Sequence, residues 1–171
     1  MERPTKNEYN PRYQAYIDLV ENGDFLELLD ENTQSTISFF QSIDVSKHNF
    51  SYAEKKWTIK EILMHIIDTE RGLSFRAIVC TRNDKSIPLY GMEEDFYAQN
   101  VDVTNITMDN LIKEFIAVRE AFKFIYVNNP IEKFNFLGDG ISHPISARAI
   151  GYIVIGHTIH HQMIMNERYL S

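Results

Sequence analysis

The sequence has little of what disulfide-stapled, fibrous, disordered or nucleic-acid-binding proteins need. Its 171 residues include one cysteine, Cys80, so no internal disulfide can form. Only 7 Gly and 5 Pro accompany a 44% hydrophobic composition, which excludes a collagen-like or low-complexity chain. The 17 Lys and Arg are outnumbered by 24 Asp and Glu, giving a formal charge of −7. This balance leaves no overall basic field for nucleic acid or anionic lipid.

Targeting and membrane-spanning segments are also missing from the pattern. Residues 1–9 are polar and lack the apolar core of a secretory signal. The longest apolar stretches are interrupted before the ~18 positions that a membrane span requires. We therefore expect a cytoplasmic protein with no nucleic-acid or membrane partner.

Four long segments show the apolar spacing of amphipathic helices. The clearest start is Thr58, because Thr58 and Glu61 match a capping box, in which both side chains satisfy free amides at a helix N-terminus. Thr107 and Ser146 offer N-caps for two later helices. The pattern predicts a short helical piece over 13–20 and long helices over 25–43, 58–81, from 107 to the Asn128-Asn129-Pro130 stop, and from 146 almost to the C-terminus.

The connection after residue 81 is long. Residues 87–105 mix Pro, Gly, acidic and aromatic residues, which predicts a crossover with a short helix near 93–99. Residues 130–144 carry the turn Gly138-Asp139-Gly140 and leave room for a small hairpin. Since no run of alternating β-branched residues stands out, we expect one all-α domain over 1–171, a four-helix bundle with a long crossover connection, after a polar lead-in at 1–10.

Three of the six histidines lie close together in the last helix. His157 and His161 are four residues apart, so they share one helix face and can direct two imidazoles at one ion. At ~100° per residue both fall near the centre of the apolar stripe, whereas His160 lies at its edge and is the weaker candidate. A buried unsatisfied polar group costs ~1–3 kcal/mol. Either a metal ion binds this pair, or both are neutral core histidines hydrogen-bonded to facing side chains.

A tight metal site needs a third ligand from another helix. His65 is the obvious candidate, although periodicity places it at the rim, roughly 100° from the centre of its helix's apolar stripe. Asp68 and Glu70 are competing ligands nearby, and the default expectation for each is a solvated surface carboxylate.

Two segments resemble the DinB-like superfamily, also called the damage-inducible or YfiT-like group: residues 57–65, WTIKEILMH, and residues 156–162, GHTIHHQ. The resemblance extends from about residue 20 to the end and includes the order and rough lengths of the helices. It implies a four-helix bundle, typically dimeric, that holds a divalent metal with one histidine of the second long helix and an H-x-x-x-H pair of the last. The implied ligands are His65, His157 and His161, while His48 and His143 match no ligand and are expected to be ordinary loop histidines.

The resemblance also implies a chemistry. Three neutral imidazoles suit zinc or nickel and leave positions for water or substrate. Relatives include thiol-dependent S-transferases, a thiol-dependent isomerase and metal-dependent hydrolases, with a small thiol such as bacillithiol or mycothiol as cofactor. We expect a homodimeric metal-dependent transferase or hydrolase that uses a divalent metal and a low-molecular-weight thiol. The alternatives are a non-catalytic metal- or ligand-binding stress-response bundle, and a bundle whose histidines only hydrogen-bond one another.

No catalytic or cofactor-binding residue beyond these ligands can be assigned from the sequence. Arg148, Arg76 and Arg71 are conceivable partners for the carboxylate of a thiol cofactor, but the default expectation for each is a surface ion pair. Cys80 falls in the apolar stripe of its helix, so we expect an inert packing residue rather than a nucleophile.

Overall fold

The computed structural model describes residues 1–140 and 142–171. Its bundle consists of four long helices, α2 (Phe25–Ser42), α3 (Ile59–Thr81), α5 (Met108–Val127) and α6 (Ala147–Arg168). Two short helices, α1 (Gln14–Asp18) and α4 (Glu94–Asn100), lie outside them, and β1 (Leu137–Gly138) pairs antiparallel with β2 (Ile145–Ser146). The short 3-10 turns are η1 (Lys6–Glu8), η2 (Pro11–Tyr13), η3 (Val45–Lys47) and η4 (Ile131–Asn135).

The predicted all-α class and the four-helix bundle are confirmed. The expected crossover and its short helix are present, and the small hairpin between α5 and α6 is the β1–β2 pair. None of the described helices combines the length and hydropathy needed to cross a membrane.

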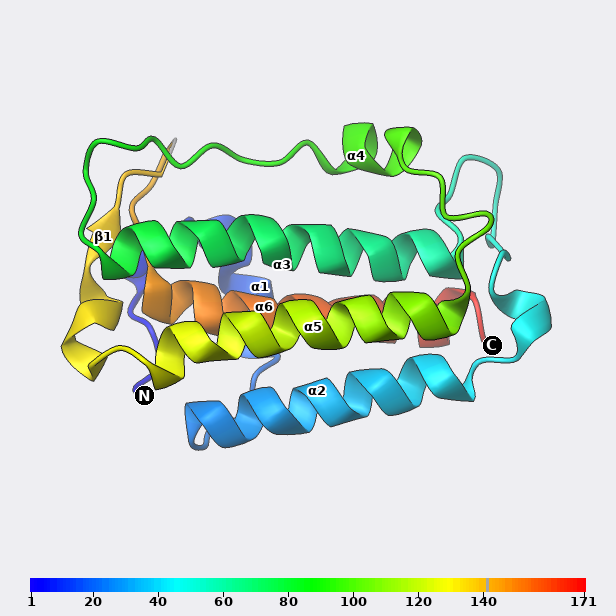
Figure 1. Ribbon diagram of the computed structural model, residues 1–171, viewed down its shortest axis with the longest axis horizontal. Helices are drawn as coiled ribbons and strands as arrows, with labels where there is room; N and C mark the ends of the chain where they lie inside the picture. Colours follow the sequence, from blue (N-terminus) through cyan, green and yellow to red (C-terminus); the bar gives the residue numbers. More distant parts are fainter. Residues whose placement is uncertain (141) are drawn as a thin grey trace.

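The crossover sets the topology. Figure 1 shows that α3 and α5 run in the same direction, while α2 and α6 run the opposite way. Because two neighbouring parallel helices cannot be joined by a short turn, the chain leaves the end of α3, returns along its outer side with α4 on the way, and then enters α5. This returning segment forms one wall above the outer face of α3.

The helix starts follow the capping chemistry that the sequence contains. The Glu61 amide donates to Thr58 Oγ1 over 3.2 Å, and the Thr58 amide donates to Glu61 Oε2 over 2.6 Å, which completes the predicted capping box. Ser146 Oγ accepts from the Ala149 amide over 2.9 Å at the start of α6. Thr107 caps α5 in the same way. All three predicted N-caps are therefore confirmed.

The first half of α6 is buried on every side. All residues from 149 to 158 are buried, because α6 packs against α1, α2 and α3 at once. Glycines allow the closest of these contacts: a Cβ on Gly156 would overlap the backbone carbonyl of Tyr16, and one on Gly151 would come within 2.7 Å of the Phe25 ring. The missing side chain at Gly156 thus lets the α1 backbone lie directly on α6.

The core divides into two apolar clusters, one toward each end of the bundle, with a polar layer between them. Within this layer, Arg119 of α5 and Glu70 of α3 form a bidentate ion pair, with Nε to Oε1 at 2.7 Å and Nη2 to Oε2 at 2.9 Å. Only 1% of Arg119 and 2% of Glu70 are exposed. The guanidinium also donates to Asn32 Oδ1 of α2 and Thr158 Oγ1 of α6, so it contacts all four long helices.

Replacing Gly156 by Ala should separate α1 from α6. The new methyl group overlaps backbone that cannot move independently, so we expect a loss of about 1–3 kcal/mol of unfolding free energy, the usual range for overpacking. Gly72→Ala is the matched control, because a Cβ at Gly72 of α3 meets nothing within 4 Å and should stabilise the helix by about 0.5–1 kcal/mol. Urea unfolding followed by far-ultraviolet circular dichroism measures both. Equal effects of the two substitutions would contradict the proposed close approach.

The buried ion pair should show strong coupling in a double-mutant cycle. Arg119→Met leaves Glu70 buried without its partner and should cost about 3–5 kcal/mol, as should Glu70→Leu, which isolates the guanidinium. The double variant should lose much less than the sum of the two, because it leaves no unpaired charge. The cycle is measured from urea unfolding curves. Additive losses would show that the two charges do not depend on each other.

Candidate metal centre

Three histidine side chains converge between α3 and α6. His157 Nε2 lies 3.1 Å from Nε2 of His65 and 3.0 Å from Nε2 of His161. One ring nitrogen from each residue falls within 4.8 Å of the others, and among the described residues this is the group with the spacing of a metal site. The structure thus brings together all three sequence-predicted ligands, including the one that comes from a different helix.

Hydrogen bonding among the histidines does not satisfy this arrangement well. In a neutral imidazole Nε2 carries either one hydrogen or one lone pair, so His157 Nε2 can form a good hydrogen bond with only one of its two neighbours. A metal ion instead accepts a lone pair from all three nitrogens. Tetrahedral zinc with bonds of about 2.0–2.1 Å places its nitrogens about 3.3 Å apart, close to the separations of 3.0 and 3.1 Å found here. The donor set fits a first-row divalent metal ion, since imidazole suits zinc, copper, iron and nickel.

Burial keeps the three imidazoles neutral. It lowers the pKa of His65 to about 4, against a small opposing effect of Asp95. Burial, reinforced by repulsion from His65 and His160, lowers the pKa of His161 to about 3. The pKa of His157 is also held well below its usual value, first by burial and then by the neighbouring histidines. Neutral imidazole is the form that binds metal, so no ligand has to lose a proton at neutral pH.

The periodicity-based placement of His65 at the rim is wrong. His65 is 5% exposed, because the first turns of α3 lie between other helices and bury residues on several faces. The Trp57 ring, just before α3, covers His65 at 4.7 Å between centroids. A helical wheel assumes one apolar face, and this part of α3 has more than one.

The other candidate ligands lie outside the cluster. His160 is half-buried and packs edge-on against Tyr16. Asp68 pairs with Arg71, as expected of a surface carboxylate. The same expectation is wrong for Glu70, which is buried because the Arg119 guanidinium compensates its charge.

The two remaining histidines and the cysteine have local roles. His48 contacts the Ile43 carbonyl through Nε2 at 3.0 Å, and exposed His143 lies beside Asn10 and Ser142. Cys80 is buried and donates to the Ile145 carbonyl, and burial raises the pKa of its thiol to about 11. The thiol therefore stays protonated at neutral pH, as expected of a packing residue.

A cavity of about 320 Å³ adjoins the histidine cluster and includes His157 in its lining. Its walls come from α1 and η2, from α3, from α6 and from the crossover. Thr69, one helical turn after His65, also lines it, and Thr69 Oγ1 is a buried hydroxyl without a hydrogen-bond partner among the described residues. The volume lies at the lower end of the ~300–1,000 Å³ range of small-molecule sites.

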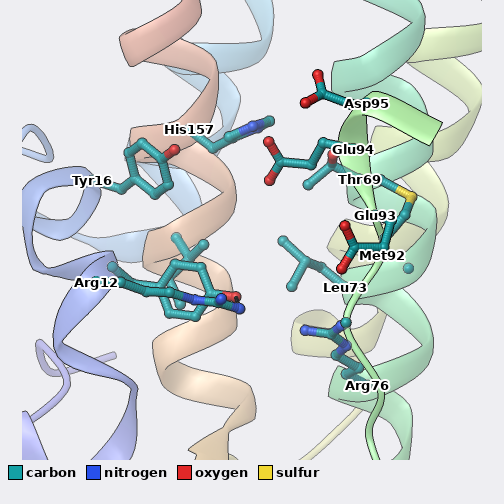
Figure 2. Close-up of a pocket in the computed structure, with 14 residues that line it drawn as sticks. Arg12, Tyr16, Thr69, Leu73, Arg76, Met92, Glu93, Glu94, Asp95 and His157 are labelled. Atoms are coloured by element: carbon teal, nitrogen blue, oxygen red, sulfur yellow. Dashed lines mark hydrogen bonds between the residues drawn. The ribbon is translucent and has the colours of Figure 1, made fainter. Parts of the chain in front are cut away.

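Charged residues that sequence reasoning missed line the same cavity. Figure 2 shows Glu94 and Asp95, from the crossover, beside His157, and Arg12 at the other end of the cavity. Burial raises the pKa of Glu94, with Arg12 opposing the shift and Asp95 and Glu93 adding to it. The sequence predicts the crossover itself, but no motif or spacing in it selects these side chains.

Of the three arginines considered from the sequence, one reaches the cavity. Arg76 lines it from α3. Arg71 pairs with Asp68 and Glu114 at the surface, as expected of an ion-pair residue. Arg148 donates to both carboxylate oxygens of Glu8, at 2.9 and 2.6 Å, and holds the N-terminal segment on α6.

Solved structures show the same fold. The chain is similar to YfiT from Bacillus subtilis, described as "a probable metal-dependent hydrolase with an unusual four-helix bundle topology", with a TM-score of 0.68 and 12% identity over 97% of this chain and 90% of that one. It is also similar to the mycothiol-dependent maleylpyruvate isomerase, with a TM-score of 0.64 and 13% identity over 81% of this chain. The match spans 58% of the isomerase's length. At these identities the likeness concerns the fold.

The sequence comparisons identify the family. No curated protein matches the chain significantly in sequence. The sequence model of the DinB superfamily, however, matches residues 28–165, well over half of the chain, and this range contains all three clustered histidines. The chain therefore belongs to the DinB superfamily.

Proposed function

We propose that this chain is a metal-dependent enzyme in which His65, His157 and His161 hold one divalent ion, zinc or nickel. The observation that carries the proposal is the convergence of three neutral imidazole nitrogens beside a cavity of small-molecule size. The description of YfiT as a probable metal-dependent hydrolase supports the metal-dependent activity, and that of the mycothiol-dependent isomerase supports the use of a low-molecular-weight thiol.

The chemistry follows from an open site. A divalent ion held by the three imidazoles would lower the pKa of a water or thiol that binds beside them, and would so supply a nucleophile at neutral pH. Glu94, whose carboxylate is directed toward His157 in Figure 2, would accept the released proton. The reaction is transfer of a low-molecular-weight thiol to an electrophile, or hydrolysis of a small substrate.

We also propose that the chain works as a cytoplasmic homodimer on a small-molecule substrate, without a nucleic-acid or membrane partner. Exposed aromatic side chains support a self-association surface, because Phe75, Tyr90 and Tyr97 are at least half exposed and line one groove between α3 and the crossover. The formal charge of −7 argues against nucleic acid.

Metal content is the direct test of the histidine site. Wild-type protein purified without an affinity tag should contain zinc or nickel, or take up either, at one ion per chain by elemental analysis. His157→Ala should lose the ion because it removes the nitrogen that lies closest to both others. His160→Ala is the matched control on the same helix and should keep it. Trp57, the single tryptophan, lies on His65, so quenching of its fluorescence by nickel gives an independent reading.

Two results would count against the proposal. Wild-type protein that is empty and fails to take up zinc or nickel would leave three packed histidines and no metal site. Metal-loaded protein that binds its ion but neither joins bacillithiol or cysteine to an alkylating electrophile nor hydrolyses small esters and amides would favour a non-catalytic metal-binding bundle. Product formation is followed by mass spectrometry, with His157→Ala as the blank.

Acid should destabilise the metal-free protein before its surface carboxylates titrate. In the unfolded chain these histidines take up protons near pH 6.5, whereas in the folded state the pKa of His65 is about 4 and that of His161 about 3. The unfolded state therefore binds more protons between pH 6.5 and about pH 4, and unfolding free energy falls as the pH falls through this range. Urea midpoints measure the slope, which His161→Ala should reduce. An unchanged slope in that variant would contradict the burial of a neutral imidazole.

A further inference from the structure

Two arginines face the cavity at the end away from the histidines. Arg12 comes from η2 and Arg76 from α3, and Figure 2 shows their guanidinium groups directed toward each other across the cavity. Both also line a narrower pocket that continues beyond this end. Two positive groups from separate elements therefore border the same space, with His157 at its opposite end.

Most of the hydrogen-bonding capacity of this pair is unused. Each guanidinium has several N–H donors. Arg12 donates to the Tyr13 hydroxyl over 2.7 Å and Arg76 donates to the Tyr90 carbonyl, and among the described residues neither has a carboxylate within ion-pair distance. Arg71, Arg119 and Arg148 differ, because each holds at least one carboxylate. Arg12 and Arg76 therefore have N–H donors left for a ligand.

The charges around Arg12 and Arg76 favour binding of an anion between them. With a formal charge of −7, the protein as a whole repels anions. Of the three carboxylates that line the cavity, those of Glu94 and Asp95 lie at the histidine end, and Figure 2 shows that of Glu93 between them and Arg76. An anion that enters the cavity is therefore attracted to the arginine end, where two planar guanidiniums match the geometry of carboxylate and phosphate oxygens.

We propose that Arg12 and Arg76 form a subsite for an anionic oxygen group of the substrate. This inference rests on the proposed function and narrows its substrate to a small molecule that carries a carboxylate or phosphate at one end and its reacting group at the other. The arginines hold the charged end, so that the reacting end lies at the three histidines. A neutral analogue of the same size loses these charge-assisted hydrogen bonds and binds more weakly.

The test uses small anions as probes of the full-length protein. Succinate and inorganic phosphate are titrated into metal-free and zinc-loaded protein, with neutral succinamide as the uncharged counterpart of succinate, and the side-chain Nε–H signals of the arginines are followed by NMR. Both anions should saturate the signals of Arg12 and Arg76, and succinamide should not. The metal-free titration excludes anion binding to the ion itself. Tighter binding of succinate assigns the subsite to a carboxylate, and tighter binding of phosphate assigns it to a phosphoryl group.

Substitutions of single arginines test whether anion binding depends on this subsite or on the overall charge of the protein. Arg12→Gln and Arg76→Gln should each weaken anion binding about ten- to a hundredfold, which corresponds to loss of one charge-assisted hydrogen bond of about 1.5–3 kcal/mol. Arg71→Gln changes the net charge equally on the same helix but lies outside this cavity, so it should bind anions like wild type. Arg76→Lys keeps the charge without the planar fork and should give an intermediate loss. Circular dichroism confirms that each variant is folded.

Two outcomes overturn the subsite: neither anion saturates the wild-type signals, or Arg71→Gln weakens binding as much as the cavity variants do. Nickel uptake, read through quenching of Trp57 fluorescence, keeps the two proposals apart. Arg12→Gln and Arg76→Gln should take up nickel like wild type, since they lie at the other end of the cavity. Anion binding in a protein that takes up no metal would sustain the subsite and refute the metal-dependent function.

Discussion

The buried pair between Arg119 and Glu70 is the contact on which the remaining geometry depends. Apolar side chains tolerate small slides of one helix on another, but a bidentate guanidinium–carboxylate pair has fixed directions and a high cost when it is broken. Arg119 also bonds Asn32 of α2 and Thr158 of α6, so one guanidinium fixes the relative positions of four helices. Glu70 follows His65 on α3 by five residues, and Thr158 directly follows His157 on α6. The network that fixes these two helices therefore also sets the histidines opposite each other.

The site combines this rigid layer with an asymmetric distribution of charge. Burial keeps the imidazoles neutral, and the ion pair beneath them is internally compensated, so neither adds net charge to the cavity. The cavity's charged groups come from η2, α3 and the crossover: the Glu94 and Asp95 carboxylates lie at one end, both guanidiniums lie at the other, and Glu93 lies between them. The neutral imidazoles, which can bind a cation, and the charged guanidiniums, which can bind an anion, thus lie at separate ends of one cavity.

Local chemistry made much of the fold predictable. Thr58, Thr107 and Ser146 start helices because each side chain accepts from an amide that the helix leaves free, and such interactions need only nearby sequence. Burial was harder to foresee, since periodicity supposes one buried face, whereas α6 and the start of α3 are enclosed on several. The resemblance to the DinB-like superfamily predicts His65 as a ligand, whereas its helical periodicity places it at the rim. Glu70 and Arg119 are 49 positions apart, and Arg12 and Arg76 meet only through tertiary packing, so nothing local in the sequence marks either pair.

Because the chain returns along the outer side of α3, different parts of the sequence form the core and the cavity wall. The four long helices carry both apolar clusters and the polar layer that joins them. The segment from Gly91 to Asp95 contributes a cavity wall while remaining largely exposed, and it contains none of the three clustered histidines. Substitutions there alter the shape and charge of the cavity with little effect on the packing of the bundle. One scaffold and one histidine cluster can in this way carry cavities of different shape and charge through exchange of a single surface segment.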